Sequence, residues 1–260
     1  MSFVHLEKLD VEGYIANVVL NRPEMRNAFN TDMANELLEV FDSIAESNVR
    51  VVLISSSNSQ AFCSGADLKD RDGMTEIQWR KQHELFERMF NAIADAPQPV
   101  IAVVDGYALA GGFEMILNCD MVVAAKTAKF GLPEVTRGIM PGCGGTRLLA
   151  KNMAINHAKE WICTGRIVDA EEANQAGLIN RLTESDTLFS EALELATRIA
   201  QNAPLAVQRC KLAVDELFIL PKKDAREREI WYYNLCVNTD DRLEGVRAFV
   251  EKRLPKFIGK

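Results

Sequence analysis

Two glutamates and two glycine-bearing loops are the residues of this chain whose types and spacing could carry chemistry together. The loops are CSGAD, residues 63–67, and AGG, residues 110–112, and each can present a bare backbone N–H group. Two such donors that converge on one carbonyl oxygen form an oxyanion hole, which stabilises negative charge on that oxygen. Glycine before a helix is also common, so either loop taken alone would more often be structural.

Glu114 and Glu134 lie in or beside these elements. Glu114 follows Gly111 by three residues at the start of a predicted helix, and Glu134 follows Pro133 in the stretch FGLPEVTRG. Two carboxylates in one pocket do not ionise freely, so one keeps its proton at a raised pKa and the pair supplies an acid and a base. The alternative is that both are acidic residues of first helical turns, stabilised by the helix dipole.

Two cations and a third glycine-rich loop could contribute to binding. Lys69 and Arg26 are candidate cations for an anionic ligand, although a single Lys or Arg is usually a solvated surface residue. The loop PGCGGT, residues 141–146, fits neither of the common nucleotide-binding patterns. We therefore expect it to turn the chain into the next helix and to donate an N–H group to the site.

Alternating strands and helices must position these residues. Strands are predicted at 14–20, 50–56, 100–106, 121–126 and 177–182, and helices between them at 31–47 and 76–96. Beyond about residue 184 the pattern is helical only, with helices predicted at 185–201, 204–217, 222–238 and 241–253. This order predicts an α/β protein, with a core over residues 1–200 and a helical region over 201–260.

Composition limits the classes of function. The 260-residue chain has a net charge of −7, which disfavours non-specific nucleic-acid binding because that needs a basic face. No apolar stretch approaches the roughly 20 residues of a membrane span, and the N-terminus does not resemble a signal peptide. Six cysteines without CxxC or zinc-ligand spacing favour free, mostly buried thiols in a cytoplasmic protein without a metal site.

Five stretches of the chain together resemble the crotonase superfamily, and within it the enoyl-CoA hydratase/isomerase group: NRPEMRNAF, AFCSGADLKD, VDGYALAGGFEMILNCDMVVAA, KFGLPEVTRGIMPGCGGT and GRIVDAEEANQAGLINRL. The resemblance is collinear from about residue 10 to the C-terminus. It implies a crotonase-type spiral of ββα turns, a C-terminal helical trimerisation region, and a homotrimer or a dimer of trimers. It also implies an acyl-CoA thioester substrate, a role in fatty acid and lipid metabolism, and no cofactor, since CoA is part of the substrate.

The resemblance also assigns roles to particular residues. It places the oxyanion hole at the N–H groups of Ala66 and Gly111, and the two catalytic glutamates of a hydratase at Glu114 and Glu134. The N–H of Gly142 would help to hold the water.

A second set of residues is implied to bind CoA. The segment Ala66-Asp67-Leu68-Lys69 would run along CoA, with Lys69 near a phosphate. Phe249 and Lys252 correspond to C-terminal residues that reach the CoA of a neighbouring subunit. The turn holding Arg26 departs from the family pattern, because Glu24 occupies a position that is often basic, and Ala110 replaces the first of three frequent glycines.

Glutamate at both positions favours a lyase that adds water to a 2-enoyl-CoA and gives a 3-hydroxyacyl-CoA. One alternative is a Δ3-Δ2 enoyl-CoA isomerase, since such enzymes typically rely on the second glutamate alone. Another is a hydratase for a branched substrate such as 3-methylglutaconyl-CoA. A non-catalytic or RNA-binding relative is disfavoured, because the predicted helix at 31–47 carries five acidic residues and no Lys or Arg.

Overall fold

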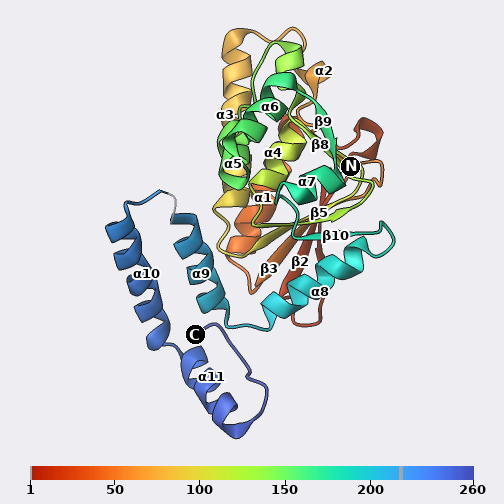
Figure 1. Ribbon diagram of the computed structural model, residues 1–260. Helices are drawn as coiled ribbons and strands as arrows, with labels where there is room; N and C mark the ends of the chain where they lie inside the picture. The colour runs from red at the N-terminus through yellow and green to blue at the C-terminus, as the bar shows by residue number, and fades with distance from the viewer. Residues whose placement is uncertain (1, 217–218) are drawn as a thin grey trace.

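The computed structural model describes residues 2–216 and 219–260. Strands β3 to β8 come in pairs that are consecutive in the chain, and each pair is followed by one or more helices (Figure 1). The first strand of each pair joins one sheet, and the second joins another. This is the spiral of ββα turns that the resemblance implies, so the predicted α/β class is confirmed. The turns are β3 (Val51–Ser56), β4 (Ala61–Cys63), α2 (Leu68–Arg71) and α3 (Glu76–Ala94); β5 (Val100–Val104), β6 (Tyr107–Leu109) and α4 (Gly111–Leu117); and β7 (Met121–Ala125), β8 (Lys129–Gly131), the 3-10 helix η2 (Pro133–Arg137), α5 (Gly145–Asn152) and α6 (Ile155–Thr164).

Two sheets form the frame of the spiral. Within the described residues, the larger sheet has the strand order β1-β2-β3-β5-β7-β10 and the smaller has the order β4-β6-β8-β9. The pairs β1·β2 and β8·β9 are antiparallel, and the other pairs are parallel. The remaining strands are β1 (Val4–Lys8), β2 (Ile15–Leu20), β9 (Ile167–Asp169) and β10 (Arg181–Thr183).

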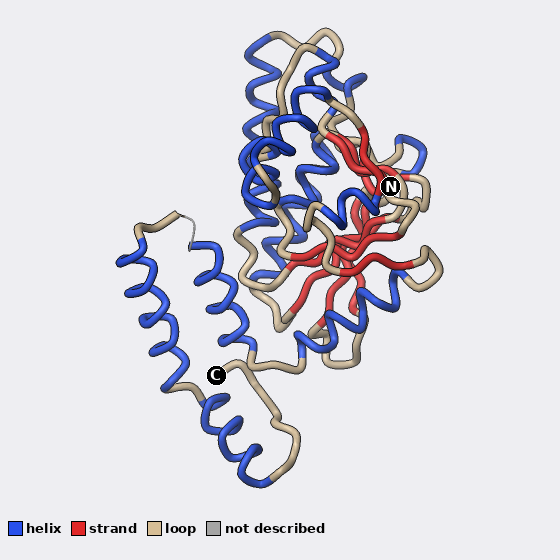
Figure 2. Tube along the Cα trace, in the orientation of Figure 1, coloured by secondary structure: helices blue, strands red, loops and turns tan. Residues whose placement is uncertain are grey.

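The larger sheet is covered by helices on both faces, which explains the continuous apolar runs of its central strands. Along β3, Val52 and Ile54 join the core cluster that contains α1 (Thr31–Ala45) and α3, whereas Val51 and Leu53 join the cluster of α8 (Leu188–Ala200). Successive side chains of a strand point to opposite faces, so a single strand supplies both clusters. Figure 2 shows α8 running across the strands on the side away from the remaining core helices.

Several predicted boundaries hold and others move. The helix predicted at 31–47 begins at Thr31 as expected, and Asn30 caps it by accepting a hydrogen bond from the Met33 N–H at 3.0 Å. The strand predicted at 177–182 starts too early, because Gly177 adopts φ +87° and the observed strand runs from Arg181 to Thr183. The cysteines are free, but only Cys63 is fully buried, so the expectation of mostly buried thiols is wrong.

The C-terminal helices project from the spiral rather than covering it (Figure 1). They are α9 (Pro204–Glu216), α10 (Lys222–Val237) and α11 (Asp240–Glu251). The short helix α7 (Ala170–Gln175) belongs to the core instead, where it packs near β9 and β10. Residue 217, the predicted end of the helix at 204–217, lies outside the described residues. The division at residue 200 stays a prediction; α8, which ends at Ala200, is the last helix represented in the two core clusters.

Two cations tie this C-terminal part to the core. Lys211 on α9 donates to the Ala96 carbonyl and the Asp120 carboxylate, both at 2.8 Å. Arg50 donates to the Ala200 carbonyl at 3.0 Å and to the Phe257 carbonyl at 2.8 Å. The core therefore holds the base of the projecting helices through polar contacts rather than through a shared apolar cluster.

Among the described residues, no helix combines the length and the apolar character needed to cross a bilayer.

Candidate active site

The two glycine-bearing loops, 45 residues apart in the sequence, meet in space. Phe29 joins the first loop, because its N–H donates to the Gly65 carbonyl and its carbonyl accepts from the Asp67 N–H, both at 2.9 Å. A Cβ atom on Gly65 would lie 2.8 Å from the Ala110 Cβ and 3.2 Å from the Gly111 nitrogen. Only glycine at position 65 allows this approach, so the Ala66 and Gly111 backbones share one small region.

The N–H groups of Ala66 and Gly111 are both available. Within the described residues neither donates a hydrogen bond, although the neighbouring Asp67 N–H does. Gly111 is the first residue of α4, where N–H groups have no partner in the helix. Two unused donors in one place are what an oxyanion hole requires.

The glycine pair at the start of α4 is required by close packing. A Cβ on Gly112 would overlap the Cys63 carbonyl, and one on Gly111 would lie 2.6 Å from the Phe29 ring. The preceding Ala110 adopts φ +52° and ψ −127°, a conformation that favours glycine. The departure seen in the sequence at position 110 therefore carries backbone strain, of the order of 1–3 kcal/mol.

Glu114 is held by the loop at 141–146. Its side chain is 3% exposed, and Oε1 accepts hydrogen bonds from the Cys143 N–H at 2.7 Å and the Gly145 N–H at 2.8 Å. Burial is the largest influence and leaves the pKa of Glu114 above its ordinary value, although these two N–H groups and the nearby His83 act in the opposite direction. The contacts favour the ionised form, so Glu114 is suited to act as a base.

Glu134 is buried without any such support. It lies in η2, is 7% exposed, and neither of its carboxylate oxygens has a hydrogen-bond partner among the described residues. Burial, with a smaller contribution from the charge of Glu114, raises the pKa of Glu134 to about 7. Burial thus raises the pKa of both glutamates, but only Glu114 accepts N–H donors that favour its anion, which suits Glu114 to the role of base and Glu134 to the role of acid.

The structure also brings His83 to the site. Its ring on α3 lies against Gly142, where a Cβ would be 2.6 Å from His83 Cε1, and its Nε2 is 3.4 Å from Glu87 Oε1. His83 is not among the residues that the sequence predicts for the site. No spacing in the sequence could have found it, because α3 meets the loop at 141–146 only through tertiary packing.

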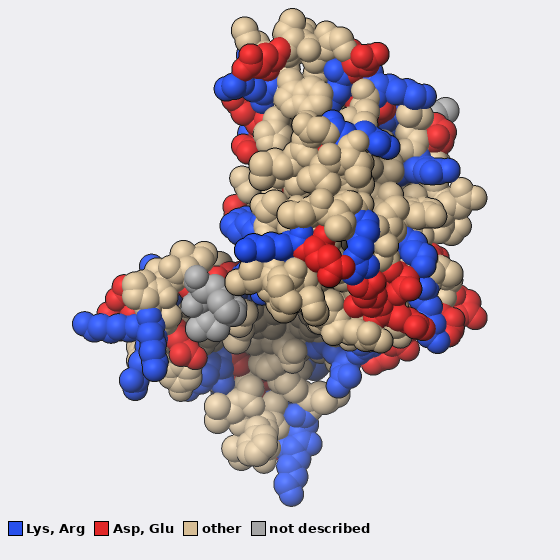
Figure 3. Space-filling model, turned by 45° about the horizontal axis from the view of Figure 1, so that its top comes forward, with Lys and Arg blue, Asp and Glu red and all other residues tan. Residues whose placement is uncertain are grey.

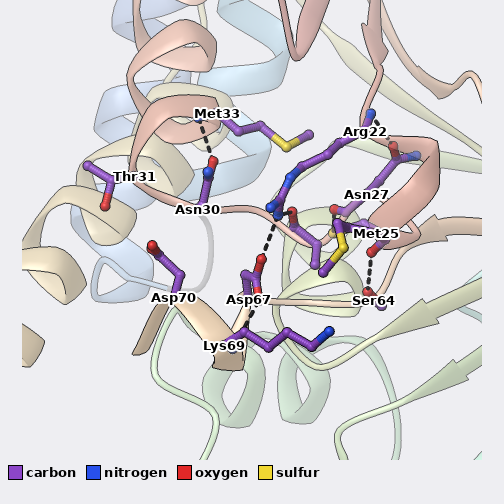
Figure 4. A network of polar contacts seen from close by, with 12 residues as sticks. Arg22, Met25, Asn27, Asn30, Thr31, Met33, Ser64, Asp67, Lys69 and Asp70 are labelled. Carbon is purple, nitrogen blue, oxygen red and sulfur yellow. Dashed lines mark hydrogen bonds and ion pairs between the residues drawn. The ribbon is translucent and has the colours of Figure 1, made fainter. Parts of the chain in front are cut away.

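The segment implied to bind CoA is anchored from within the protein. Asp67 pairs with Arg22 at 2.8 Å and caps α2 by accepting from the Lys69 N–H at 3.0 Å (Figure 4). Burial alone would raise the pKa of Asp67, but the hydrogen bond and charge of Arg22 hold it below its usual value. Its carboxylate is therefore already engaged, and Arg22, rather than Arg26, is the cation of the 22–26 turn that contacts this loop.

The other residues implied to bind CoA are exposed. Leu68, Lys69 and Arg26 lie at the surface, and Figure 4 shows the Lys69 side chain extending away from the Arg22–Asp67 pair. Phe249 is 85% exposed on α11, and Lys252 ends that helix in the left-handed conformation. Within one chain α11 projects away from the spiral (Figure 1), so the structure does not bring Phe249 and Lys252 to the glutamates.

Comparisons with known proteins identify the family. The family model described as enoyl-CoA hydratase/isomerase matches residues 10–260. The human protein named enoyl-CoA hydratase domain-containing protein 2, mitochondrial, is 41% identical over 251 residues, which cover 95% of this chain and 86% of that protein. The crotonyl-CoA hydratase of Syntrophomonas wolfei is 36% identical over 256 residues, covering 97% of each chain.

A solved structure extends the likeness to the backbone. The crystal structure of an enoyl-CoA hydratase from Bacillus anthracis superposes with a TM-score of 0.96 at 36% sequence identity, and the match covers 99% of this chain and 100% of that one. The fold, the two facing loops and the sequence matches lead to one conclusion. The chain belongs to the enoyl-CoA hydratase/isomerase family of the crotonase superfamily.

Proposed function

We propose that this enzyme is a hydratase that adds water across the 2,3 double bond of a 2-enoyl-CoA and releases a 3-hydroxyacyl-CoA. The observation that carries the proposal is a buried pair of glutamates, of which only Glu114 is held by N–H donors, next to two unused N–H donors. The name of the Syntrophomonas wolfei relative, a crotonyl-CoA hydratase, supports the same reaction.

The thioester carbonyl oxygen is proposed to lie between the N–H groups of Ala66 and Gly111. As water adds to C3, electrons of the double bond move toward this oxygen, and the two donors stabilise the resulting negative charge. Because the Gly65 backbone packs directly on Ala110 and Gly111, the two donors are held in place before substrate arrives. Little reorganisation is then needed in the transition state.

The two glutamates move the protons. Ionised Glu114 takes a proton from water, whose oxygen forms the new bond to C3, while protonated Glu134 delivers its proton to C2 from the same side. Glu114 ends protonated and Glu134 ionised, and exchange with solvent restores both. The Gly142 N–H is proposed to help hold the water. Since backbone donors and carboxyl groups perform every step, we propose that no cofactor is required.

The remaining assignments concern substrate binding and assembly. Arg26 and the segment Asp67-Leu68-Lys69 are proposed to bind CoA, together with Phe249 and Lys252 of a neighbouring copy. A homotrimer or a dimer of trimers would bring α11 to a neighbour's site. The exposed apolar side chains of α10 and α11 support this assembly, and Figure 3 shows a hollow between the projecting helices and the body of the molecule.

The decisive test is the hydration of crotonyl-CoA, followed as the loss of ultraviolet absorbance of the conjugated thioester. We expect Glu114→Gln and Glu134→Gln each to lower kcat by about 10²–10⁴-fold, because each removes one proton-transfer group. Glu84→Gln, an exposed change on α3, is the matched control. Near wild-type turnover in either active-site variant, with binding of CoA esters retained, would refute that residue's role.

An isomerase is the second candidate, and one observation favours it. Both oxygens of Glu134 are unpaired, so this single carboxylate has the freedom to take a proton from C2 and return it to C4. Incubation with a 3-enoyl-CoA separates the reactions: an isomerase yields the 2-enoyl-CoA, whereas a hydratase leaves the 3-enoyl-CoA unchanged. A branched substrate such as 3-methylglutaconyl-CoA belongs to the same assay.

The cellular setting also stays a proposal. A role in fatty acid and lipid metabolism in the cytoplasm suits a CoA-ester hydratase, although the name of the human relative assigns that protein to mitochondria. We propose no nucleic-acid or membrane partner. On the face drawn in Figure 3, basic and acidic side chains are interspersed, in keeping with the net charge of −7.

A further inference from the structure

Arg71 is a buried cation with an unused donor. It ends α2, is 8% exposed, and its Nη2 atom has no hydrogen-bond partner in the described part of the chain. Its Nε donates to Gln82 Oε1 at 2.8 Å, and the guanidinium lies 4.1 Å from the centroid of the Trp79 ring. The group is thus held in one orientation by α3 while one N–H-bearing atom is left free.

Two aromatic rings connect Arg71 to the proposed oxyanion hole. The helix that carries it begins two residues after Ala66, whose N–H is one of the proposed oxyanion donors. The guanidinium is 5.1 Å from the centroid of Phe86, which makes an edge-to-face contact at 4.8 Å with Phe29. The Phe29 ring lies directly against Gly111. A continuous aromatic path therefore joins the buried cation to the oxyanion hole.

No carboxylate of the described residues forms an ion pair with Arg71. The adjacent Asp70 instead accepts a hydrogen bond from Gln82 Nε2 at 2.7 Å, and Figure 4 shows its carboxylate turned toward Thr31. Glu87, on the next turn of α3, is near His83. Burying a cation is costly unless an anion or hydrogen-bond acceptors compensate it, so this arrangement is incomplete without a further acceptor.

We propose that Arg71 binds a carboxylate at the far end of the acyl chain, so that the preferred substrates are 2-enoyl-CoA esters of dicarboxylic acids. The proposal rests on the function proposed above and narrows its substrate class. The planar guanidinium matches a carboxylate better than an ammonium group does, and the aromatic faces around it exclude water. A simple alkyl chain would leave Nη2 without a partner.

The opposing interpretation is that Arg71 only supports α2 and α3 through Gln82 and Trp79. A structural role of that kind would affect all substrates alike, because it acts through the shape of the site. A recognition role changes the ratio of two substrates that differ only at the far end of the chain. The experiment must therefore measure selectivity rather than activity.

Glutaconyl-CoA and 2-pentenoyl-CoA form the matched pair, since both have a 2,3 double bond and a five-carbon chain that ends in a carboxylate or a methyl group. We expect wild-type kcat/KM to favour glutaconyl-CoA, and Arg71→Met to lower the ratio of the two values by about 10- to 100-fold. Arg71→Lys keeps the positive charge but removes the planar pair of guanidinium donors, so it should give an intermediate ratio. Arg80→Met removes an exposed cation of α3 and should leave the ratio unchanged.

Binding of the saturated esters separates this proposal from the hydratase reaction. Titration calorimetry with glutaryl-CoA and pentanoyl-CoA should show the same loss of preference in Arg71→Met, whether or not water is added to any ester. If neither unsaturated ester is hydrated, but wild type prefers glutaryl-CoA and Arg71→Met loses that preference, the proposed hydration is wrong and the carboxylate site is supported. If wild type shows no preference, or if the Arg71 variants weaken both esters equally, the carboxylate site is refuted. Should Arg71→Met fail to fold, Arg71→Lys decides by the same ratios.

Discussion

Helices α4 and α10 belong to two regions built in opposite ways. All seven residues of α4 are buried, whereas only Tyr232 is buried among the sixteen of α10. The spiral completes its own core and encloses the glutamates, while the C-terminal helices expose apolar side chains to solvent. Exposed apolar area of this extent marks an interaction surface. The proposed reacting groups therefore all lie in the self-contained spiral, whereas the C-terminal helices offer the surface on which the proposed assembly would form.

The largest expected effect contrasts one glycine from each region. Gly112→Ala places a Cβ on the Cys63 carbonyl, so we expect the free energy of unfolding to fall by about 3 kcal/mol and kcat/KM by about 100-fold or more. In Gly245→Ala on α11, the added Cβ would contact only the Phe257 ring, at 3.5 Å. This variant should raise the free energy of unfolding slightly, because alanine has the higher helix propensity. Thermal melts and crotonyl-CoA assays of both variants provide the check; equal effects would show that the two regions do not differ in packing.

The second prediction concerns assembly. Val246 and Val250 are 58% and 73% exposed on α11, so the double variant Val246→Glu/Val250→Glu should reduce the mass in light scattering to that of one 29.0 kDa chain. Charges buried in an interface without partners are costly, whereas in an isolated chain they would be solvated. Ile77→Glu, 69% exposed on α3, is the control and should leave the mass unchanged. A wild-type protein that is itself monomeric would overturn the prediction.

The third prediction uses the unsupported carboxyl of Glu134. Its pKa of about 7 in the folded chain exceeds the ordinary value of 4.5, so its contribution to stability is complete below about pH 4.5 and is lost as pH rises through 7. At pH 8, Glu134→Gln should therefore exceed wild type in free energy of unfolding by up to about 3 kcal/mol, and by little at pH 4. Denaturant unfolding at the two pH values measures the difference.

Activity should follow the same titration. If Glu134 must hold a proton, wild-type kcat/KM for crotonyl-CoA falls as pH rises through about 7. A kcat/KM that stays level from pH 6 to 9 would mean that Glu134 is not the acid.

The smallest effect is expected at Ala110. Ala110→Gly removes the strain of φ +52°, but it also increases the freedom of the unfolded chain, so we expect a net gain of about 1 kcal/mol. The melting temperature should rise by roughly 2–4 °C without a change in kcat. Ala248→Gly, buried in α11, is the comparison and should destabilise, because glycine there leaves a small cavity and lowers helix propensity.

Long capped helices and the two glutamates could be predicted from the sequence because their signals are local. Asn30 precedes an amphipathic run, and Glu114 and Glu134 lie at recognisable turns. The strands β4, β6, β8 and β9 could not, because three residues are too few to show a periodicity and they form only when successive turns stack. The ring of His83 over Gly142 was missed for the same reason.

Partner identity within the loops was also beyond the sequence. The loop at 141–146 was expected to donate an N–H to the site, but that Cys143 and Gly145 donate and that Glu114 accepts depends on the path of the loop. Arg26 was singled out, whereas Arg22 forms the ion pair with Asp67. Both residues lie in the same turn, and only the direction of the backbone through it distinguishes them.

Successive turns of the spiral each contribute part of the proposed site, so a growing chain acquires these parts one after another. The turn β3-β4-α2 supplies Ala66, the turn β5-β6-α4 supplies Gly111 and Glu114, and the turn that begins with β7 supplies Glu134 and the loop that holds Glu114. A nascent chain that stops before residue 141 carries both glutamates and both oxyanion donors but lacks that loop. If these residues perform the proposed hydration, a chain that ends before residue 141 is expected to be inactive, because it lacks the third glycine-rich loop, whose N–H groups hold Glu114.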